Sequence, residues 1–146
     1  MQIIKFSNTL IPQSYRNEIA LFLEEHLQQY GDSYEDISLA LDYVSDTSGS
    51  KGGYLLVAQH DDVVTGAVVV NKTGMSGYIP ENILVYIATH HDYRGKGIGK
   101  MLMEEVVNLC EGSIALHCEP DNPARKLYEK LGFSSKYLEM RLVKVR

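Results

Sequence analysis

Three glycines, Gly95, Gly97 and Gly99, stand at every second position between an apolar run and a helical pattern. A glycine inside a regular element weakens it by about 0.5–1 kcal/mol relative to alanine, so this spacing indicates a role for the backbone itself. The first amides of a helix lack partners within the helix, and the helix dipole places partial positive charge there. Because glycine lets a phosphate approach those amides without a Cβ atom in the way, the pattern predicts a phosphate-binding loop. Arg94 and Lys96 add positive charge at the same place.

Two familiar phosphate-binding loops fit this stretch poorly. A P-loop requires four residues between its first glycine and a Gly-Lys-Ser/Thr triplet, whereas Gly95 lies too near Gly99 and Lys100, and Met101 offers no hydroxyl for magnesium. A dinucleotide-binding loop requires G-x-G-x-x-G directly after its strand, and here the spacing is G-x-G-x-G after the polar segment THHDY. Glu119 imitates the ribose-binding acid of such a loop, but the chain leaves no room for a second, catalytic domain.

The stretch RGKGIG, Arg94 to Gly99, resembles the R/Q-x-x-G-x-G/A signature of the GNAT superfamily of N-acetyltransferases. A second segment, NPARKLYEKLGF, resembles the N-x-x-A-x-x-L-Y-x-x-x-G-F signature of the same superfamily. Both occur in the superfamily's order, and the clear resemblance covers residues 83–133. Asn122 lies one residue closer to Tyr128 than in the commonest form, so Asp121 is a second candidate for the asparagine position. The resemblance implies a single N-acetyltransferase domain, residues 1–146.

The resemblance implies that acetyl-CoA is the co-substrate and that no metal takes part. Loop amides would hold its pyrophosphate, and the preceding strand would splay from the next one so that its main chain pairs with the pantetheine arm. One of those amides would stabilise the charge that develops on the thioester oxygen. Asn122 would contact the pantetheine, although it can equally cap the following helix. The expected cofactor-binding residues are Ile87, Ala88, Thr89, Arg94, Gly95, Lys96, Gly97, Ile98, Gly99, Lys100 and Asn122.

The implied reaction is direct attack of a primary amine on the thioester within a ternary complex. A protonated amine, with an ordinary pKa of about 10.4 for lysine, cannot attack, so a base must remove a proton. The resemblance offers Glu81, at the start of the central strand, and His117, on the strand after the glycine-bearing helix. Tyr128 would serve the departing sulfur as acid or hydrogen-bond donor. Each of the three has a structural alternative: a solvated carboxylate, a packed imidazole and a core phenol.

The histidines and cysteines indicate no metal site. No pair of them has the spacing of zinc ligands, and the adjacent His90 and His91 are expected to point in different directions. Cys110, on a helical apolar stripe, and Cys118, on a strand, are expected to be free, buried thiols.

Composition limits the partners. The 146 residues include 14 Lys and Arg against 19 Asp and Glu, a net charge of −5, whereas nucleic-acid binding requires a basic face. The acidic balance weakly favours a cationic acceptor. No apolar run is long enough to cross a bilayer, and MQIIKFSNTL lacks the features of a signal peptide, so a cytoplasmic protein without a membrane partner is expected.

The elements that must position these residues follow from periodicity. One helix should run from Pro12 to Gly31, a second should begin after Asp32 or Ser33, and two more should cover GIGKMLMEEVVNLCEG and NPARKLYEKLGF. The expected strands are MQIIKFS, YLLVAQHDD, TGAVVVNKTG, NILVYIATH, SIALHCE and KYLEMRLVKV. The order β-α-α-β-β-β-α-β-α-β predicts an α/β domain built on a mixed sheet. The resemblance implies that this is a GNAT-like fold, with a mixed, mostly antiparallel sheet flanked by helices.

The sequence leaves the acceptor open: a small molecule, a peptide or a protein. Dimers are common in the superfamily, so a homodimer is one expectation. A non-catalytic acyl-CoA-binding regulatory module is the alternative function, and the glycine loop does not distinguish transfer to oxygen or transfer of longer acyl chains.

Overall fold

The structure is a computed structural model that describes residues 1–49 and 51–145. Contacts divide the chain into two compact units, Met1–Leu116 and His117–Arg146. In chain order the elements are β1 (Gln2–Ser7), α1 (Gln13–Leu27), the 3₁₀ helix η1 (Gln28–Tyr30), α2 (Tyr34–Ser45), β2 (Gly53–His60), β3 (Val63–Lys72), β4 (Asn82–Thr89), the 3₁₀ helix η2 (His91–Tyr93), α3 (Ile98–Leu109), β5 (Ile114–Leu116) and α4 (Arg125–Lys130).

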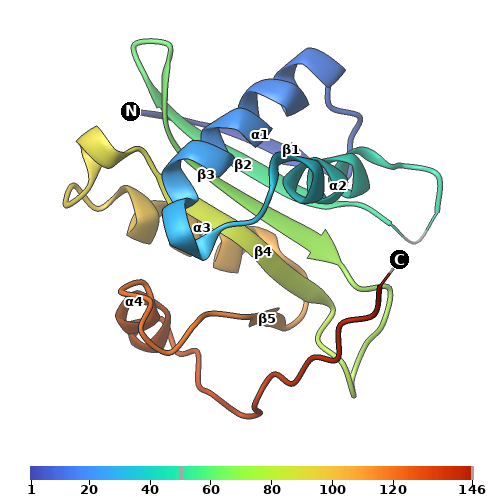
Figure 1. The fold of residues 1–146 in the computed structure, drawn as a ribbon. Helices are drawn as coiled ribbons and strands as arrows, with labels where there is room; N and C mark the ends of the chain where they lie inside the picture. The colour runs from blue at the N-terminus through green and yellow to red at the C-terminus, as the bar shows by residue number, and fades with distance from the viewer. Residues whose placement is uncertain (50, 146) are drawn as a thin grey trace. The chain divides into compact units, whose positions relative to one another are not determined.

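The first unit is built on a five-stranded sheet in the order β1-β2-β3-β4-β5. The first four strands are antiparallel, and β5 pairs with β4 in parallel (Figure 1). The β2–β3 hairpin turns through Asp61 and Asp62, both at positive φ, as a tight two-residue turn requires. The predicted fold class, a mixed and mostly antiparallel sheet with flanking helices, is confirmed.

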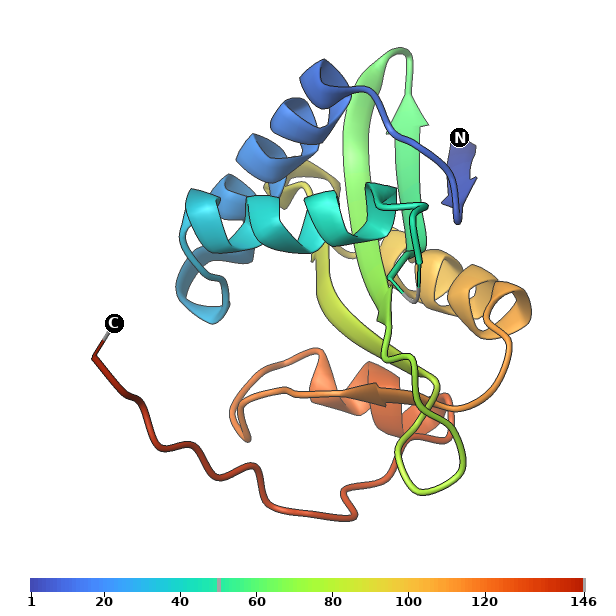
Figure 2. The ribbon, with the colours of Figure 1, turned by 90° about the vertical axis from the view of Figure 1, so that its right-hand side faces the viewer.

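Helices cover both faces of this sheet (Figure 2). α1 and α2 pack on one face, where Leu23 and Leu41 join Val57 and Val69 in a fully buried core. α3 lies on the opposite face, and its buried stripe consists of Ile98, Leu102, Met103 and Val106. Ser33 caps α2 by accepting a hydrogen bond from the Asp36 amide at 3.2 Å, so Ser33 rather than Asp32 has the capping role.

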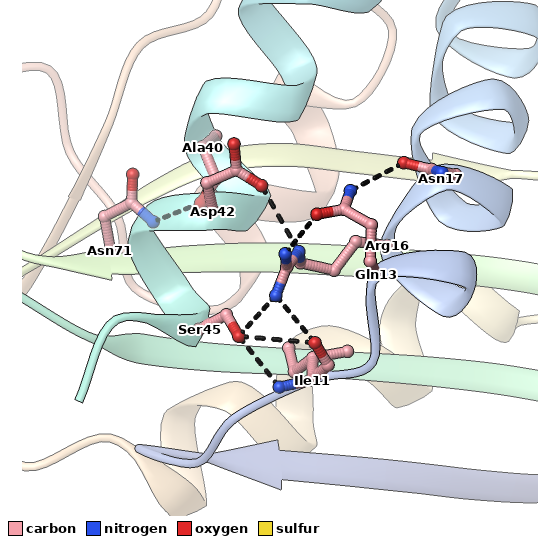
Figure 3. Close-up of polar contacts among 8 residues, drawn as sticks. All are labelled: Ile11, Gln13, Arg16, Asn17, Ala40, Asp42, Ser45 and Asn71. Atoms are coloured by element: carbon pink, nitrogen blue, oxygen red, sulfur yellow. Dashed lines mark hydrogen bonds and ion pairs between the residues drawn. The ribbon is translucent and has the colours of Figure 1, made fainter.

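A half-buried arginine ties α1 to α2 (Figure 3). Arg16 donates from Nη1 to the Ile11 carbonyl at 2.6 Å and to Ser45 Oγ at 2.8 Å, and its Nε lies 3.2 Å from Asp42 Oδ1. The Ile11 amide donates to the same Ser45 oxygen at 2.8 Å. This network fixes the start of α1 against the end of α2, and so fixes the helical layer against which β4 packs.

The prediction of a last strand, KYLEMRLVKV, is wrong. The described part of this segment, which belongs to the second unit, forms no helix or strand. Its apolar side chains are at least 80% exposed: Tyr137, Leu138, Met140, Leu142, Val143 and Val145. Alternating side chains are typical of a strand, but a strand also needs a neighbour for its backbone groups, and no described residue of the second unit forms a strand that could pair with this segment.

Candidate active site

The glycine loop connects β4 and η2 to the start of α3. Gly95 and Gly97 have φ values of +79° and +80°, in the left-handed region that favours glycine. Gly97 is the N-cap of α3, so no capping side chain covers the first amides of the helix. A Cβ atom added at either glycine would have no neighbour within 4 Å, which means that the space above the loop is open. The residues therefore fit a phosphate group bound to the main chain.

Gly66 of β3 sets how closely α3 approaches the sheet. A Cβ atom at this position would lie 2.8 Å from Ile98 Cγ2 and 2.9 Å from Leu102 Cδ1. The first turn of α3 therefore rests directly on the sheet beside the carbonyl of Ala88, which would lie 3.3 Å from the same Cβ atom. This contact places the N-terminus of α3 near the end of β4.

The two loop cations are held by neighbouring groups. The Arg94 guanidinium donates from Nη2 to the main-chain carbonyl of His26, in the last turn of α1, at 3.0 Å. Lys96 Nζ lies 5.1 Å from the centre of the Tyr93 ring, a cation–π distance. Arg94 thus anchors the loop to α1 as well as contributing charge.

The edge of β4 that faces β5 is paired over only part of its length. The parallel ladder joins Asn82, Ile83 and Leu84 to residues 114–116 and stops there, while β4 continues to Thr89. A register shift in the β3–β4 ladder, between Val69 and Val70, leaves Val85 unmatched, as in a β-bulge. Among the described residues, no strand pairs with this edge beyond Leu84, so Ile87, Ala88 and Thr89 lie on a free stretch of backbone.

Glu81 lies at the opposite end of β4, where its carboxylate accepts a hydrogen bond from the Ser113 amide at 3.0 Å. Hydrogen bonds from backbone amides, that of Ser113 first, lower the pKa of Glu81. A carboxylate with a lowered pKa is a weaker base. Glu81 and Glu111 help to line an open cavity of about 400 Å³ together with Tyr54 and Lys72.

In the second unit, Tyr128 lies on α4 and is 6% exposed, as predicted for a core-facing ring. Its ring meets Phe133 edge-on, with 6.1 Å between ring centres. Burial, followed by repulsion from Cys118, raises the pKa of Tyr128 to about 12. The phenol therefore keeps its proton at neutral pH and can act as a donor.

Two other predicted residues of the second unit have different surroundings from those expected. β5 ends at Leu116, so His117 is an exposed residue outside the strand, and Cys118 is likewise off the strand and only half-buried. The strand is short because its ladder with β4 has only three residue pairs. Asn122 accepts a hydrogen bond from the Ala124 amide at 2.9 Å, in a local turn before α4 rather than as the helix cap, and its Nδ2 remains a donor.

Three histidines of the first unit gather beside the loop. The expectation that His90 and His91 point in different directions is wrong: their ring centres lie 4.8 Å apart, and both rings contact His26 of α1. The 3₁₀ turn at His91–Tyr93 folds the two neighbours back together, which a strand would not do. Burial, followed by repulsion from His90, lowers the pKa of His26, so its ring is neutral at pH 7.

Cys110, also expected to be buried, is a half-buried free thiol at the C-cap of α3.

A tyrosine–aspartate pair was not found by the sequence reasoning. Tyr86 of β4 donates from its hydroxyl to Asp32 Oδ2, in the loop before α2, at 2.5 Å. Burial and the neighbouring carboxylate raise the pKa of Tyr86. Because the partners are 54 residues apart, no local spacing could have indicated this polar site.

Residues 51–135 match the family model of the acetyltransferase (GNAT) domain, which is more than half of the chain. The chain therefore belongs to the GNAT acetyltransferase family, as the two motifs predicted. Among curated proteins, it is similar to the 5-NmdU N-acetyltransferase of Pseudomonas phage PaMx11. The two are 26% identical over 102 residues, which cover 68% of this chain and 70% of the relative.

Solved structures support the fold. A ribosomal-protein-alanine N-acetyltransferase from Brucella melitensis biovar Abortus 2308 matches with a TM-score of 0.66 and 21% identity, over 99% of this chain and 100% of that one. An aminoglycoside acetyltransferase from an uncultured soil metagenomic sample matches with a TM-score of 0.70 and 14% identity, over 99% and 98%. None of the helices within residues 1–49 and 51–145 is long and apolar enough to cross a membrane.

Proposed function

We propose that the protein transfers the acetyl group of acetyl-CoA to a primary amine of a small molecule, a peptide or a protein, by direct attack in a ternary complex. The observation that carries this proposal is the open glycine loop at the N-terminus of α3, in a chain of the GNAT family. Acetyl-CoA supplies the activated acetyl group, and the chain supplies binding, orientation and proton transfer. The match of the family model runs from the first compact unit into the second, which supports treating them as one catalytic domain.

The main chain does most of the binding in this proposal. The amides of residues 95–100 hold the pyrophosphate, where partial positive charge from α3 meets negative charge from the ligand. The unpaired edge of β4 from Ile87 to Thr89 offers backbone groups to the amide-bearing pantetheine arm, as it would to another strand. An amide of β4 aimed at the thioester oxygen would stabilise the charge that develops there during attack.

Proton transfer is assigned to side chains. Tyr128, a protonated and buried phenol, donates a hydrogen bond to the departing sulfur. For the base, His117 and Glu81 are the candidates. His117 is the favoured base, because its side chain is exposed. Glu81 is disfavoured, because its pKa is lowered and its carboxylate already accepts a hydrogen bond from the Ser113 amide.

Two observations support an amine acceptor. The curated relative bears the name of an N-acetyltransferase, which favours transfer to nitrogen over transfer to oxygen. The cavity beside β4 is lined by two acidic residues, Glu81 and Glu111, against one cation, Lys72, and this acidic balance suits a protonated amine before it loses its proton.

The test is release of free CoA thiol from acetyl-CoA in the presence of a panel of primary amines, small molecules and peptides included. We expect at least one amine to raise the rate above the acceptor-free background, with mass spectrometry showing an acetylated amine. Gly97→Val should abolish that rate. A panel that shows no turnover, in a protein that binds acetyl-CoA tightly, would instead support the alternative of a non-catalytic acyl-CoA-binding module.

A further inference from the structure

His26, His90 and His91 form a group, the histidine cluster, which the proposed acetyl transfer does not use. One ligand nitrogen from each residue can be chosen so that all three lie within 4.8 Å of one another. His26 is buried, His90 is half-buried and His91 is exposed, so the cluster has an open side. The cluster joins the last turn of α1 to the segment between β4 and the glycine loop.

The ring nitrogens of His26 and His91 face each other. His26 Nδ1 lies 3.2 Å from His91 Nδ1 and 3.2 Å from the His91 amide, which donates to it. The other nitrogen of each ring lies beside a carboxylate: His26 Nε2 is 3.6 Å from Glu25, and His91 Nε2 is 3.3 Å from Asp92. Carboxylates favour a proton on the nitrogen that they face, which leaves lone pairs on the two Nδ1 atoms that face each other.

His26 Nδ1 has one lone pair, which now accepts the hydrogen bond from the His91 amide, so a metal ion can bind this nitrogen only if His26 gives up that bond. A metal ion would then lie between the two Nδ1 atoms that face each other. Two nitrogens bound to a tetrahedral zinc ion at about 2.0–2.1 Å lie about 3.3 Å apart, close to the separation found here. Imidazole nitrogens suit Zn²⁺ and its neighbours Co²⁺, Ni²⁺ and Cu²⁺.

We propose that the histidine cluster binds a single divalent transition-metal ion of the Zn²⁺ class, through Nδ1 of His26, Nδ1 of His91 and one ring nitrogen of His90. His90 Nδ1 now accepts a hydrogen bond from the Asp92 amide at 3.1 Å, so His90 joins the site by giving up this bond. Glu25 and Asp92 orient the two Nδ1 ligands from the second nitrogen of each ring, as carboxylates do in many zinc sites.

Bound metal would fasten the glycine loop to α1. The Arg94 guanidinium already bonds the His26 carbonyl, and the ion would add a second link between the same two segments. A ligand that binds the folded chain and not the unfolded chain raises its stability. At about 100 times the dissociation constant, the melting temperature should therefore rise by roughly 8 °C.

The experiment uses full-length protein without a histidine tag, stripped with a chelator, and titrates it with Zn²⁺ alone by calorimetry. We expect one ion per chain with micromolar or tighter affinity, and a visible d–d absorption band when Co²⁺ replaces Zn²⁺. His91→Ala removes an exposed side chain, so the fold should survive, and affinity should fall on the order of 100-fold. Asp92→Asn should weaken binding about tenfold by loosening the His91 ring.

His60→Ala is the matched control, because His60 also lies beside an aspartate, Asp61, but outside the cluster. It should leave Zn²⁺ affinity, stoichiometry and the rise in melting temperature unchanged. The proposal is overturned if the wild-type chain takes up no stoichiometric Zn²⁺ at micromolar concentration. It is equally overturned if His91→Ala binds as the wild type does, or if His60→Ala loses the same affinity, since the ions would then be bound adventitiously.

Discussion

Gly97 matters more to the proposed phosphate site than either loop cation, because its backbone both ends the loop and begins α3. A β-branched side chain at φ +80° is strained by at least about 1–2 kcal/mol, and it would also occupy the open space above the loop. We predict that Gly97→Val remains folded and loses acetyl-CoA affinity by at least about 100-fold, a loss of about 2.7 kcal/mol. Calorimetric titration with acetyl-CoA measures this.

Gly77→Val is the matched control for strain. Gly77 has a φ of +73° and the same open surroundings, but it lies in the loop between β3 and β4. Both variants should melt at similarly lowered temperatures, and only Gly97→Val should lose acetyl-CoA. Wild-type affinity in a folded Gly97→Val variant would remove the main support of the proposed function.

Tyr128 is predicted to act in the chemical step rather than in binding. With its pKa at about 12 and an ordinary thiol near 8.5, full proton transfer to a free thiolate is uphill by roughly 5 kcal/mol. A hydrogen bond to the partly charged sulfur is the feasible form of assistance. We expect Tyr128→Phe to lower kcat on the order of 10²-fold, with acetyl-CoA affinity and melting temperature nearly unchanged.

Tyr137→Phe is the matched control, because Tyr137 lies in the same unit and is 80% exposed. This variant should leave kcat, acetyl-CoA affinity and melting temperature unchanged. If kcat of Tyr128→Phe stays within about threefold when chemistry limits the rate, the residue only fills the core. A large fall in melting temperature would mean that the hydroxyl is structural.

Glu81 gives a prediction about pH. Its folded-state pKa lies below the ordinary value of 4.5, so its hydrogen bond with the Ser113 amide stabilises the fold above about pH 4.5. This stability is lost as pH falls through the lowered pKa. We expect Glu81→Gln to melt below the wild type at pH 7 and level with it in strong acid, whereas Glu104→Gln, on the exposed side of α3, shows no such trend.

Glu81→Gln, compared with His117→Ala, also distinguishes the two candidate bases. If His117 is the base, His117→Ala should lose most of the wild-type kcat, and Glu81→Gln should retain most of it. A large loss of kcat in Glu81→Gln, together with a wild-type kcat in His117→Ala, would assign the base to Glu81.

Among the helices, strands and loops, the sequence predicted correctly those whose structure depends on residues close together in the chain. The glycine loop and the helix that follows it each depend on a few neighbouring residues, and both are present. The length of β5 and the missing strand after α4 depend instead on which backbone is available for pairing. The histidine cluster was missed for a similar reason, because His26 and His91 are 65 residues apart.

Gly66 links the packing of α3 to the phosphate site. Its φ is not in the left-handed region, so alanine fits the backbone, but the new methyl group would press on Ile98 and Leu102. Overpacking of this kind costs about 1–3 kcal/mol. We predict for Gly66→Ala a lower melting temperature together with acetyl-CoA affinity reduced about fivefold, as the first turn of α3 moves from the sheet.

Gly49→Ala adds the same atom where no neighbour lies within 4 Å, and it should change neither quantity. Destabilisation of Gly66→Ala with unchanged acetyl-CoA affinity would show that the contact supports the core without positioning the loop.

At the scale of the whole molecule, the proposal requires both substrates to be bound together, and Cys110 is a poor nucleophile for the alternative, an acetyl-enzyme. The half-buried thiol of Cys110 has its pKa raised to about 11 by burial, so it carries almost no thiolate at pH 7. Initial rates measured with both substrates varied should therefore give intersecting double-reciprocal lines. The double variant Cys110→Ala, Cys118→Ala should keep kcat within about threefold of the wild type and an unchanged acetyl-CoA affinity. Mass spectrometry of protein incubated with acetyl-CoA alone should show no stoichiometric, thiol-sensitive acetyl adduct. Parallel lines, a burst of CoA release without any amine, and loss of that burst in the double variant would together establish an acetyl-cysteine intermediate, and direct attack by the amine would have to be abandoned.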